Sequence, residues 1–190
     1  MNPDQEQLLL KTKRFQVVQV SEPRRDTTDA VRQIIRHPGA VTIFPDLGDG
    51  RICLIRNHRL SVGRELIELP AGTLEANETP VDCARRELRE ETGYQTQHFR
   101  LLHTFYLSPG ILDERMHLFL AEGLVPGNPS REPGEQIENV VVTFQEALEM
   151  VRHGRIEDAK TIVGLLYYNR FVSQGAQASK ESNSSTPDHS

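Results

Sequence analysis

The sequence predicts an α+β protein or an α/β/α sandwich built around a mixed sheet. Stretches of β-type residues are interleaved with only a few helical patterns, and the two kinds do not alternate as regular βαβ units. The 190 residues are enough for one domain with a sizeable core and a small appended subdomain. We find no internal repeat.

The first half of the chain is rich in expected strands. Residues 1–11 show no clear pattern and are expected to be loosely ordered. Asp49-Gly50 is a hairpin-turn signal between two of the strands. The expected strands cover residues 15–20, 31–36, 40–44, 51–56 and 66–69.

The first helix is marked at both ends. Thr79 is a suitable N-cap, Pro80 suits the first helical position, and Asp82 places a negative charge in the first turn. Gly93 is a suitable stop just beyond the last turn. These signals predict a helix over residues 80–92.

Strands are expected next at residues 99–107, 115–122 and 140–144, with a turn at Ser108-Pro109-Gly110. Two helices are expected at residues 145–153 and 159–171, the second capped by Asp158. Residues 173–190 are rich in Ser, Gln and Asn, offer little to bury, and are expected to be disordered.

Composition excludes several classes of protein. The net charge is −5 with both signs mixed along the chain, which argues against a nucleic-acid partner. No apolar run approaches the length of about 18 residues that a membrane span needs. Cys53 and Cys83 form no disulfide framework and are expected to be inert core thiols. The N-terminus lacks the pattern of a signal peptide, so a cytoplasmic location is expected.

Three carboxylates crowd one edge of the first helix. At about 100° per residue, Glu87, Glu90 and Glu91 share an arc of about 100° beside an apolar stripe. Such crowding costs stability, and a hard cation such as Mg²⁺ would offset it, because carboxylates together with substrate phosphates are its usual ligands. The alternative is a solvated acidic face that pairs with Arg85, Arg86 and Arg89.

The same segment resembles a known motif. Residues 72–94 read GTLEANETPVDCARRELREETGY, which resembles the Nudix box at every fixed position. The fixed positions are Gly72, Glu78, Arg86, Glu87, Leu88, Glu90, Glu91, Gly93 and Tyr94. Nudix proteins are mostly Mg²⁺- or Mn²⁺-dependent pyrophosphohydrolases that cut a nucleoside diphosphate linked to another group. The resemblance implies the Nudix α/β/α sandwich with a mixed sheet.

Strings outside the box resemble the ADP-ribose pyrophosphatase branch of that family. Residues 68–72 read ELPAG, and Pro109 lies 16 positions after Gly93. Residues 56–59 and 62–64 resemble an R-x-x-R and V-G-R run, and residues 158–161 resemble the opening of the last helix. The resemblance implies a small N-terminal β-sheet that forms a homodimer. It divides the chain into a dimerisation segment (1–44), a Nudix hydrolase domain (45–172) and a disordered tail (173–190).

The resemblance also implies roles within the box. Glu87 and Glu91 are the first-choice ligands for Mg²⁺ or Mn²⁺, with Glu90 either a third ligand or a group that positions water, and the backbone carbonyl of Ala71 contacts a metal. Glu78 would support the motif through Arg86, which is expected to be structural. Gly72 and Gly93 would serve backbone conformation.

Other residues are candidates for catalysis and substrate binding. By resemblance the general base is a glutamate on a later loop, where Glu135 is the first choice and Glu138 the second. An exposed acidic loop without a catalytic role is the alternative. Arg59 is the choice for the substrate diphosphate, because arginine binds phosphate bidentately. Its alternative is a surface salt bridge. Arg56 is a weaker choice, and Glu114 could also face the substrate.

The expected function is hydrolysis of ADP-ribose, a small-molecule nucleotide, to AMP and ribose 5-phosphate. One alternative is hydrolysis of another nucleoside diphosphate sugar or of a damaged nucleotide. Another alternative is a non-catalytic sensor of ADP-ribose-like ligands, which is disfavoured because Glu87, Glu90 and Glu91 are all present.

Overall fold

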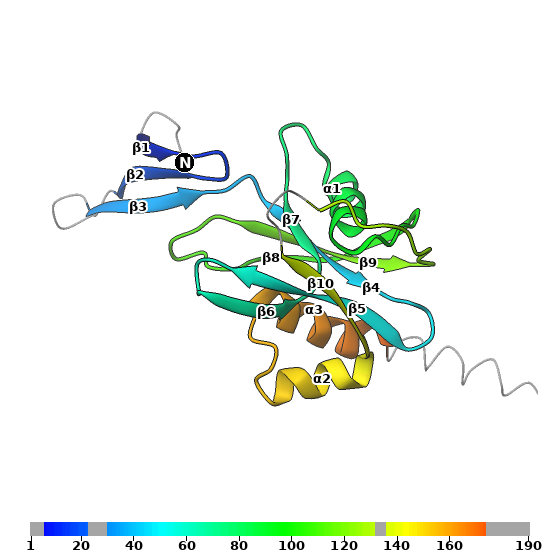
Figure 1. The fold of residues 1–190 in the computed structure, drawn as a ribbon. Helices are drawn as coiled ribbons and strands as arrows, with labels where there is room; N and C mark the ends of the chain where they lie inside the picture. Colours follow the sequence, from blue (N-terminus) through cyan, green and yellow to red (C-terminus); the bar gives the residue numbers. More distant parts are fainter. Residues whose placement is uncertain (1–5, 23–29, 132–135, 174–190) are drawn as a thin grey trace, which may run out of the picture.

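The computed structural model describes residues 6–22, 30–131 and 136–173. A four-stranded and a three-stranded sheet form the body of the molecule, and a second three-stranded sheet projects from it (Figure 1). No helix among these residues is long and apolar enough to cross a membrane.

The four-stranded sheet contains the most deeply buried strand. Its order is β7 (Ala71–Thr73), β4 (Ala40–Pro45), β9 (Arg115–Glu122) and β8 (His98–Tyr106). All six residues of β4 are buried. The pair β4–β9 is parallel and the other two pairs are antiparallel, so the predicted mixed sheet is confirmed.

The second sheet of the body is antiparallel, in the order β10 (Ile137–Thr143), β5 (Arg51–Arg59) and β6 (Arg64–Glu68). The turn predicted at Asp49-Gly50 joins β4 to β5, with an antiparallel bridge between Asp46 and Ile52 and a hydrogen bond from the backbone N–H of Leu47 to the carbonyl of Arg51 at 3.0 Å. The pairing does not extend into a long hairpin, because β4 and β5 lie in different sheets. The buried strand β4 pairs instead with β7 and β9 on its two edges.

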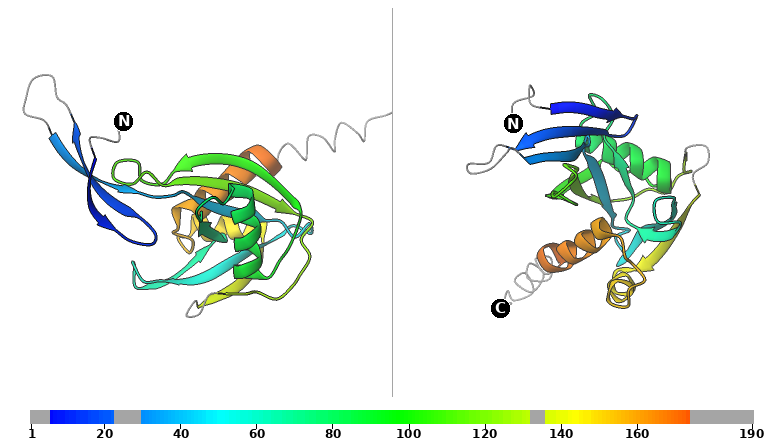
Figure 2. Two further views of the ribbon diagram at one scale, coloured as in Figure 1. Left: turned by 90° about the horizontal axis from the view of Figure 1, so that it is seen from above. Right: turned by 90° about the vertical axis from the view of Figure 1, so that its left-hand side faces the viewer.

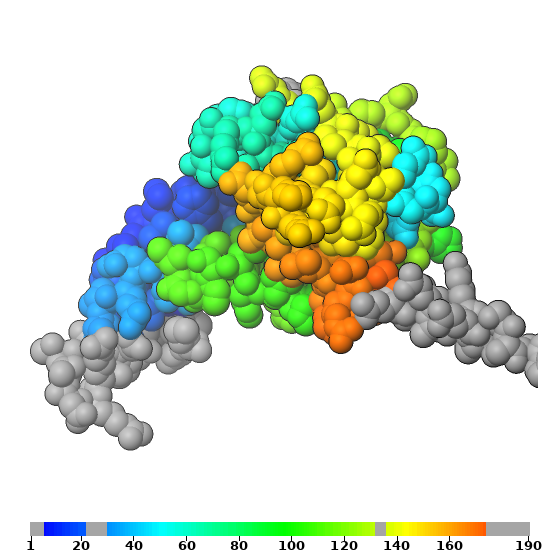
Figure 3. Space-filling view, turned by 90° about the horizontal axis from the view of Figure 1, so that it is seen from below, coloured from blue at the N-terminus to red at the C-terminus, as the bar shows by residue number. Residues whose placement is uncertain are grey.

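Helices cover the sheets from opposite sides (Figure 1). Helix α1 (Pro80–Glu87) packs on one face of the four-stranded sheet through a cluster that includes Val41, Ile43 and Leu88. Helices α2 (Phe144–Arg152) and α3 (Ala159–Tyr168) lie on the other side, where they form an outer surface of the molecule (Figure 3). Their cluster joins Phe44 to side chains of β5 and α3. This arrangement is the predicted α/β/α sandwich.

The projecting sheet is N-terminal and antiparallel. It consists of β1 (Glu6–Lys11), β2 (Gln16–Glu22) and β3 (Ala30–Arg36), and it stands apart from the body in the left-hand view of Figure 2. Strand β1 was not predicted, because its run of three leucines has no alternation and pairing with β2 supplies its order. Arg36 connects the sheet to the body through an ion pair with Asp113 at 3.0 Å, and it also pairs with Glu6 of β1 within the sheet.

Strand β4 belongs to the body of the molecule, since it is buried within the four-stranded sheet. The N-terminal sheet ends at Arg36, and β4 begins at Ala40. A division of the chain at residue 44 would therefore separate β4 from the sheet to which it belongs. The tail predicted to be disordered lies outside the described residues apart from Ser173, which ends a π-helical turn (Asn169–Ser173).

Candidate functional site

The site is built on helix α1, whose start is as predicted. Thr79 is the N-cap and its side chain accepts a hydrogen bond from the backbone N–H of Asp82. The α-helix ends at Glu87, and residues Leu88–Thr92 form a wider π-helical turn that stops at Gly93, where φ is 80°. The expected single helix over 80–92 is therefore an α-helix followed by a π-turn. Such turns are frequent at functional sites.

A neighbouring loop satisfies the carbonyl groups at the end of this turn. The backbone N–H of Ser130 donates to the carbonyl of Glu90 at 3.0 Å. The Arg131 guanidinium donates to the carbonyl of Glu91 at 3.2 Å, and the Asn139 amide donates to that of Thr92 at 2.8 Å. These three contacts fix the segment that carries Glu90 and Glu91.

Two of the predicted metal ligands lie against strand β7. Glu91 is only 5% exposed, and its carboxylate accepts a hydrogen bond from the backbone N–H of Ala71 at 2.9 Å. A Cβ atom at Gly72 would lie 1.8 Å from the Oε1 of Glu87, so the close approach of this carboxylate requires glycine. Glu87, Glu91 and the backbone at Ala71 are thus brought together.

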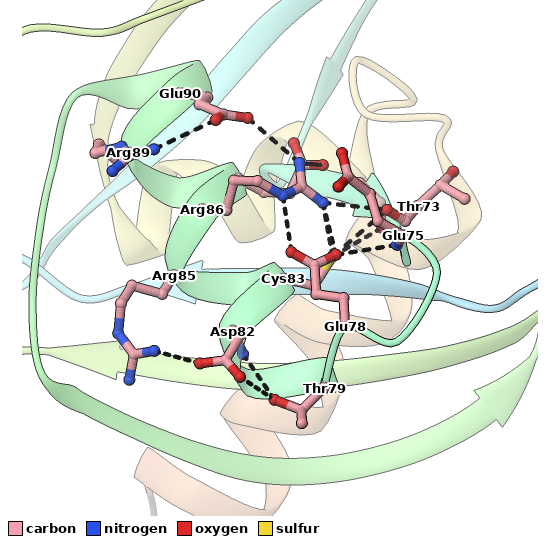
Figure 4. Close-up of polar contacts among 12 residues, drawn as sticks. Thr73, Glu75, Glu78, Thr79, Asp82, Cys83, Arg85, Arg86, Arg89 and Glu90 are labelled. Atoms are coloured by element: carbon pink, nitrogen blue, oxygen red, sulfur yellow. Dashed lines mark hydrogen bonds and ion pairs between the residues drawn. The ribbon is translucent and has the colours of Figure 1, made fainter.

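Arg86 holds the loop and the helix together (Figure 4). Its Nε and Nη2 donate to the two carboxylate oxygens of Glu78 at 2.8 and 2.9 Å, and its Nη1 donates to Glu87 at 2.6 Å and to Glu90 at 3.3 Å. The hydrogen bond from Arg86 is the main reason that the pKa of Glu78 falls to about 2. One guanidinium therefore compensates three carboxylates.

The donor set at this edge fits a hard divalent cation. Carboxylates and backbone oxygens are the ligands that Mg²⁺ prefers, and Glu87, Glu91 and the β7 backbone provide them. Within the described ranges no three acidic, histidine or cysteine side chains converge in metal-binding geometry, because Arg86 draws Glu87 and Glu90 toward itself. A bound ion would compete with Arg86 for the carboxylate of Glu87.

A pocket of about 350 Å³ lies beside β7. Arg59 and Glu114, two of the predicted substrate-binding residues, line it together with Ala71 and Gly72. The carboxylate of Glu114 lies 3.7 Å from Nδ1 of His37. The other lining residues are Ala40, Ser61, Val62, Leu66, Glu68, Thr73, Leu107, Met116, Asp158 and Lys160.

Arg59 is part of a buried ionic cluster that sequence reasoning missed. Its guanidinium donates to both oxygens of Glu68, at 2.8 and 2.6 Å, and Glu68 is fully buried. Lys160, 6% exposed, also pairs with Glu68 and lies 3.0 Å from Asp158. Glu68 and Lys160 lie in the strings at residues 68–72 and 158–161, but nothing in the sequence indicates that these two strings are in contact.

This cluster keeps Glu68 ionised. Burial alone would raise the pKa of Glu68, but the hydrogen bond from Arg59 and the charges of Lys160 and Arg59 outweigh it and lower the pKa. The hydrogen bond with Glu68 raises the pKa of Arg59 in turn. The alternative role for Arg59, a salt bridge, is present, but its partner Glu68 is buried. Arg59 also lines the pocket, so both roles are compatible.

Two other candidates do not line this pocket. Arg56 and Glu138 lie opposite each other on β5 and β10, form an exposed ion pair at 3.2 Å, and are not among the pocket residues. Glu135 lies outside the described residues.

Cys53 and Cys83 are buried, and burial raises the pKa of both thiols, that of Cys53 to about 12, as expected for unreactive cysteines.

Comparison with known proteins agrees with the fold and the motif. The NUDIX domain family matches residues 36–162, and the chain belongs to the Nudix family. It is 38% identical over 151 residues to the ADP-ribose pyrophosphatase of Bacillus subtilis, covering 78% of this chain and 80% of the relative. It is 37% identical over 141 residues to the GDP-mannose pyrophosphatase of Yersinia enterocolitica, covering 70% and 73%.

A solved structure shows the same fold. The crystal structure of an ADP compounds hydrolase superposes with a TM-score of 0.78 at 18% sequence identity, covering 90% of this chain and 94% of that chain. The ADP-compound hydrolase fold therefore accommodates nearly all of this protein.

The ion pair between Glu78 and Arg86 predicts a specific acid sensitivity. The folded pKa of Glu78, about 2, lies below the ordinary value of 4.5. Its contribution is therefore complete above pH 4.5 and is lost as the pH falls toward 2. Glu78→Gln should lower the free energy of unfolding at pH 7 by about 2–3 kcal/mol, and the loss should shrink below pH 4.5. Urea unfolding across this pH range measures both effects.

Glu75→Gln is the matched control, because Glu75 is exposed on the same loop. Equal urea midpoints for the two variants at pH 7 would contradict the structural role of Glu78.

Proposed function

We propose that this protein is a metal-dependent pyrophosphohydrolase that cleaves ADP-ribose to AMP and ribose 5-phosphate. One observation carries the proposal: β7 joins two groups of residues. Its backbone meets the carboxylates of Glu87 and Glu91 on one side, and its residues line the pocket that Arg59 faces on the other. A diphosphate bound beside β7 would lie within reach of both.

The residues have complementary roles in this proposal. Glu87, Glu91 and the carbonyl of Ala71 would hold Mg²⁺ or Mn²⁺, with Glu90 as a further ligand or a positioner of water. The bound ion supplies charge neutralisation at the diphosphate and lowers the pKa of water. Arg59 would bind the phosphates, since its guanidinium is planar and always charged. Glu114 borders the pocket and would face the bound substrate.

A second substrate class is GDP-mannose or another nucleoside diphosphate sugar. The similar identities to an ADP-ribose pyrophosphatase (38%) and a GDP-mannose pyrophosphatase (37%) favour testing both. The protein is incubated with Mg²⁺ and a panel of ADP-ribose, GDP-mannose and oxidised nucleotides. Chromatography of the products then shows which substrate class is cleaved. Binding of ADP-ribose without cleavage of any of these compounds would favour the non-catalytic sensor.

Cleavage should require the acidic edge of the box helix. Glu87→Gln and Glu91→Gln should each lower kcat for ADP-ribose by at least about 100-fold, because each removes a charge that binds the metal. EDTA should abolish the activity, and added Mg²⁺ or Mn²⁺ should restore it. Asp82→Asn, on the exposed side of the same helix, is the control and should keep near-normal turnover. Full activity in EDTA would exclude the metal assignment.

The general base is proposed to be Glu135. A glutamate in a loop that contains Pro133 and Gly134 can move in when substrate binds. Glu135→Gln should then lower kcat sharply with KM within a few-fold, as for a contact made only in the transition state. Glu138→Gln is the matched control, because Glu138 pairs with Arg56 on the surface. A silent Glu135→Gln beside an impaired Glu138→Gln would reverse the assignment.

We also propose that the N-terminal sheet forms a homodimer. Leu8, Leu10 and Val31 of this sheet are each about half exposed, and exposed apolar side chains on a projecting sheet suit an interface with a second copy of the chain. The two unpaired, buried cysteines suit a reducing compartment, which supports the cytoplasm as the location.

Deletion of residues 1–36 should therefore give an inactive monomer in analytical ultracentrifugation. This deletion keeps β4, so loss of the dimer would not follow from loss of a core strand. Deletion of residues 174–190 is the control and should leave both assembly and activity unchanged. An active monomer lacking residues 1–36 would refute the role of the N-terminal sheet.

A further inference from the structure

The ionic cluster beside the pocket contains a buried cation that the proposed mechanism does not use. Lys160 lies in the first turn of α3, and its ammonium group reaches across to Glu68 at the end of β6. It also borders the pocket. A lysine that is 6% exposed is costly to bury, so its partners must compensate for the lost hydration.

Asp158 also pairs with Lys160 at 3.0 Å, but its carboxylate has other partners. Asp158 caps α3 and accepts hydrogen bonds from the backbone N–H of Thr161 at 3.0 Å and from its hydroxyl at 2.6 Å. The positive end of the helix therefore already stabilises this carboxylate. The Thr161 hydroxyl also accepts a hydrogen bond from the backbone N–H of Leu69 at 2.8 Å, which fixes the start of α3 beside Glu68.

Glu68 links Lys160 to Arg59. One oxygen of Glu68 accepts from Nε of Arg59, and the other accepts from both Nη2 of Arg59 and Nζ of Lys160. Without Lys160, Arg59 alone would neutralise the buried carboxylate of Glu68. With Lys160 present, two cations share the charge of Glu68, so Glu68 compensates less of the charge of Arg59.

Arg59 keeps one part of its guanidinium for another partner. Its side chain is 36% exposed and borders the pocket. Across the described ranges, Nε and Nη2 bond Glu68 and Nη1 has no hydrogen-bond partner. A guanidinium fixed along one edge and open at the other is prepared for an anion, because little side-chain entropy remains to be lost on binding.

We propose that Lys160 is a positioning residue: by sharing the charge of Glu68, it keeps the guanidinium of Arg59 available to a phosphate group of the ligand. This inference rests on the proposed function only in taking the ligand to be a nucleoside diphosphate compound. Lys160 acts through Glu68 and Arg59 and does not itself touch the ligand.

The test is a double-mutant cycle on the binding of ADP. Titration calorimetry measures the Kd of every variant in the same buffer, which contains Mg²⁺. Arg59→Ala and Lys160→Met should each raise the Kd for ADP about tenfold or more, since each weakens a charged contact. The double variant should match Arg59→Ala within about threefold, because Lys160 has no effect without Arg59. Lys160→Arg, which keeps the charge, should stay within about threefold of the wild type.

A purely structural role gives a different result. Lys160→Met would then lower Tm and leave the Kd of the folded protein unchanged, which would overturn the proposal. Additive effects of Arg59→Ala and Lys160→Met would also overturn it.

If Lys160→Met does not fold, Glu68→Gln is compared with Glu68→Gln/Lys160→Met. Once Glu68 is neutral, loss of Lys160 should change the Kd less than about threefold, and a larger change would refute action through Glu68. A wild-type protein that does not bind ADP would also refute the inference. A protein that binds ADP and cleaves no ADP-ribose would refute the proposed function alone, because the cycle needs no cleavage.

Discussion

Three carboxylates must stay close together, Glu87 and Glu90 on the box helix and Glu78 on the loop before it, and the guanidinium of Arg86 meets this constraint. It contacts Glu78, Glu87 and Glu90 and also the backbone carbonyl of Thr73. The same group therefore sets the acidic edge, the loop before the helix and the end of β7. Because β7 forms one wall of the pocket, the shape of the pocket depends on a contact made outside it.

The pocket lies between two differently balanced groups of charges. On the box helix, the three carboxylates of Glu87, Glu90 and Glu91 outnumber the two arginines that pair with them, Arg86 and Arg89, so a further cation would improve the charge balance. In the Glu68 cluster, two carboxylates and two cations are matched. An anionic ligand with a bound metal complements both, although the whole chain carries a net charge of −5.

Local signals predicted the parts of the structure that local chemistry determines. Thr79, Pro80 and Gly93 mark the ends of the site helix, because caps and stops are set by neighbouring backbone groups. Strand β1 and the partners of β4 could not be read in this way, since strand pairing depends on distant residues. The pair Glu68–Lys160 spans 92 positions, so two separately noted strings gave no sign of their contact. The π-turn was missed because periodicity alone does not distinguish it from an α-helical turn.

The parallel pairing of β4 with β9 has a consequence for how the chain folds. Residues 40–45 of β4 can pair only after residues 115–122 of β9 have been synthesised. Contacts between residues so distant in sequence form slowly. Glu68 must likewise remain hydrated until α3, the last α-helix described, docks beside it. The pocket is therefore completed late, after most of the chain has left the ribosome, and partly synthesised chains expose the apolar surface of β4. We expect this protein to depend on chaperones more than a helical protein of equal length would.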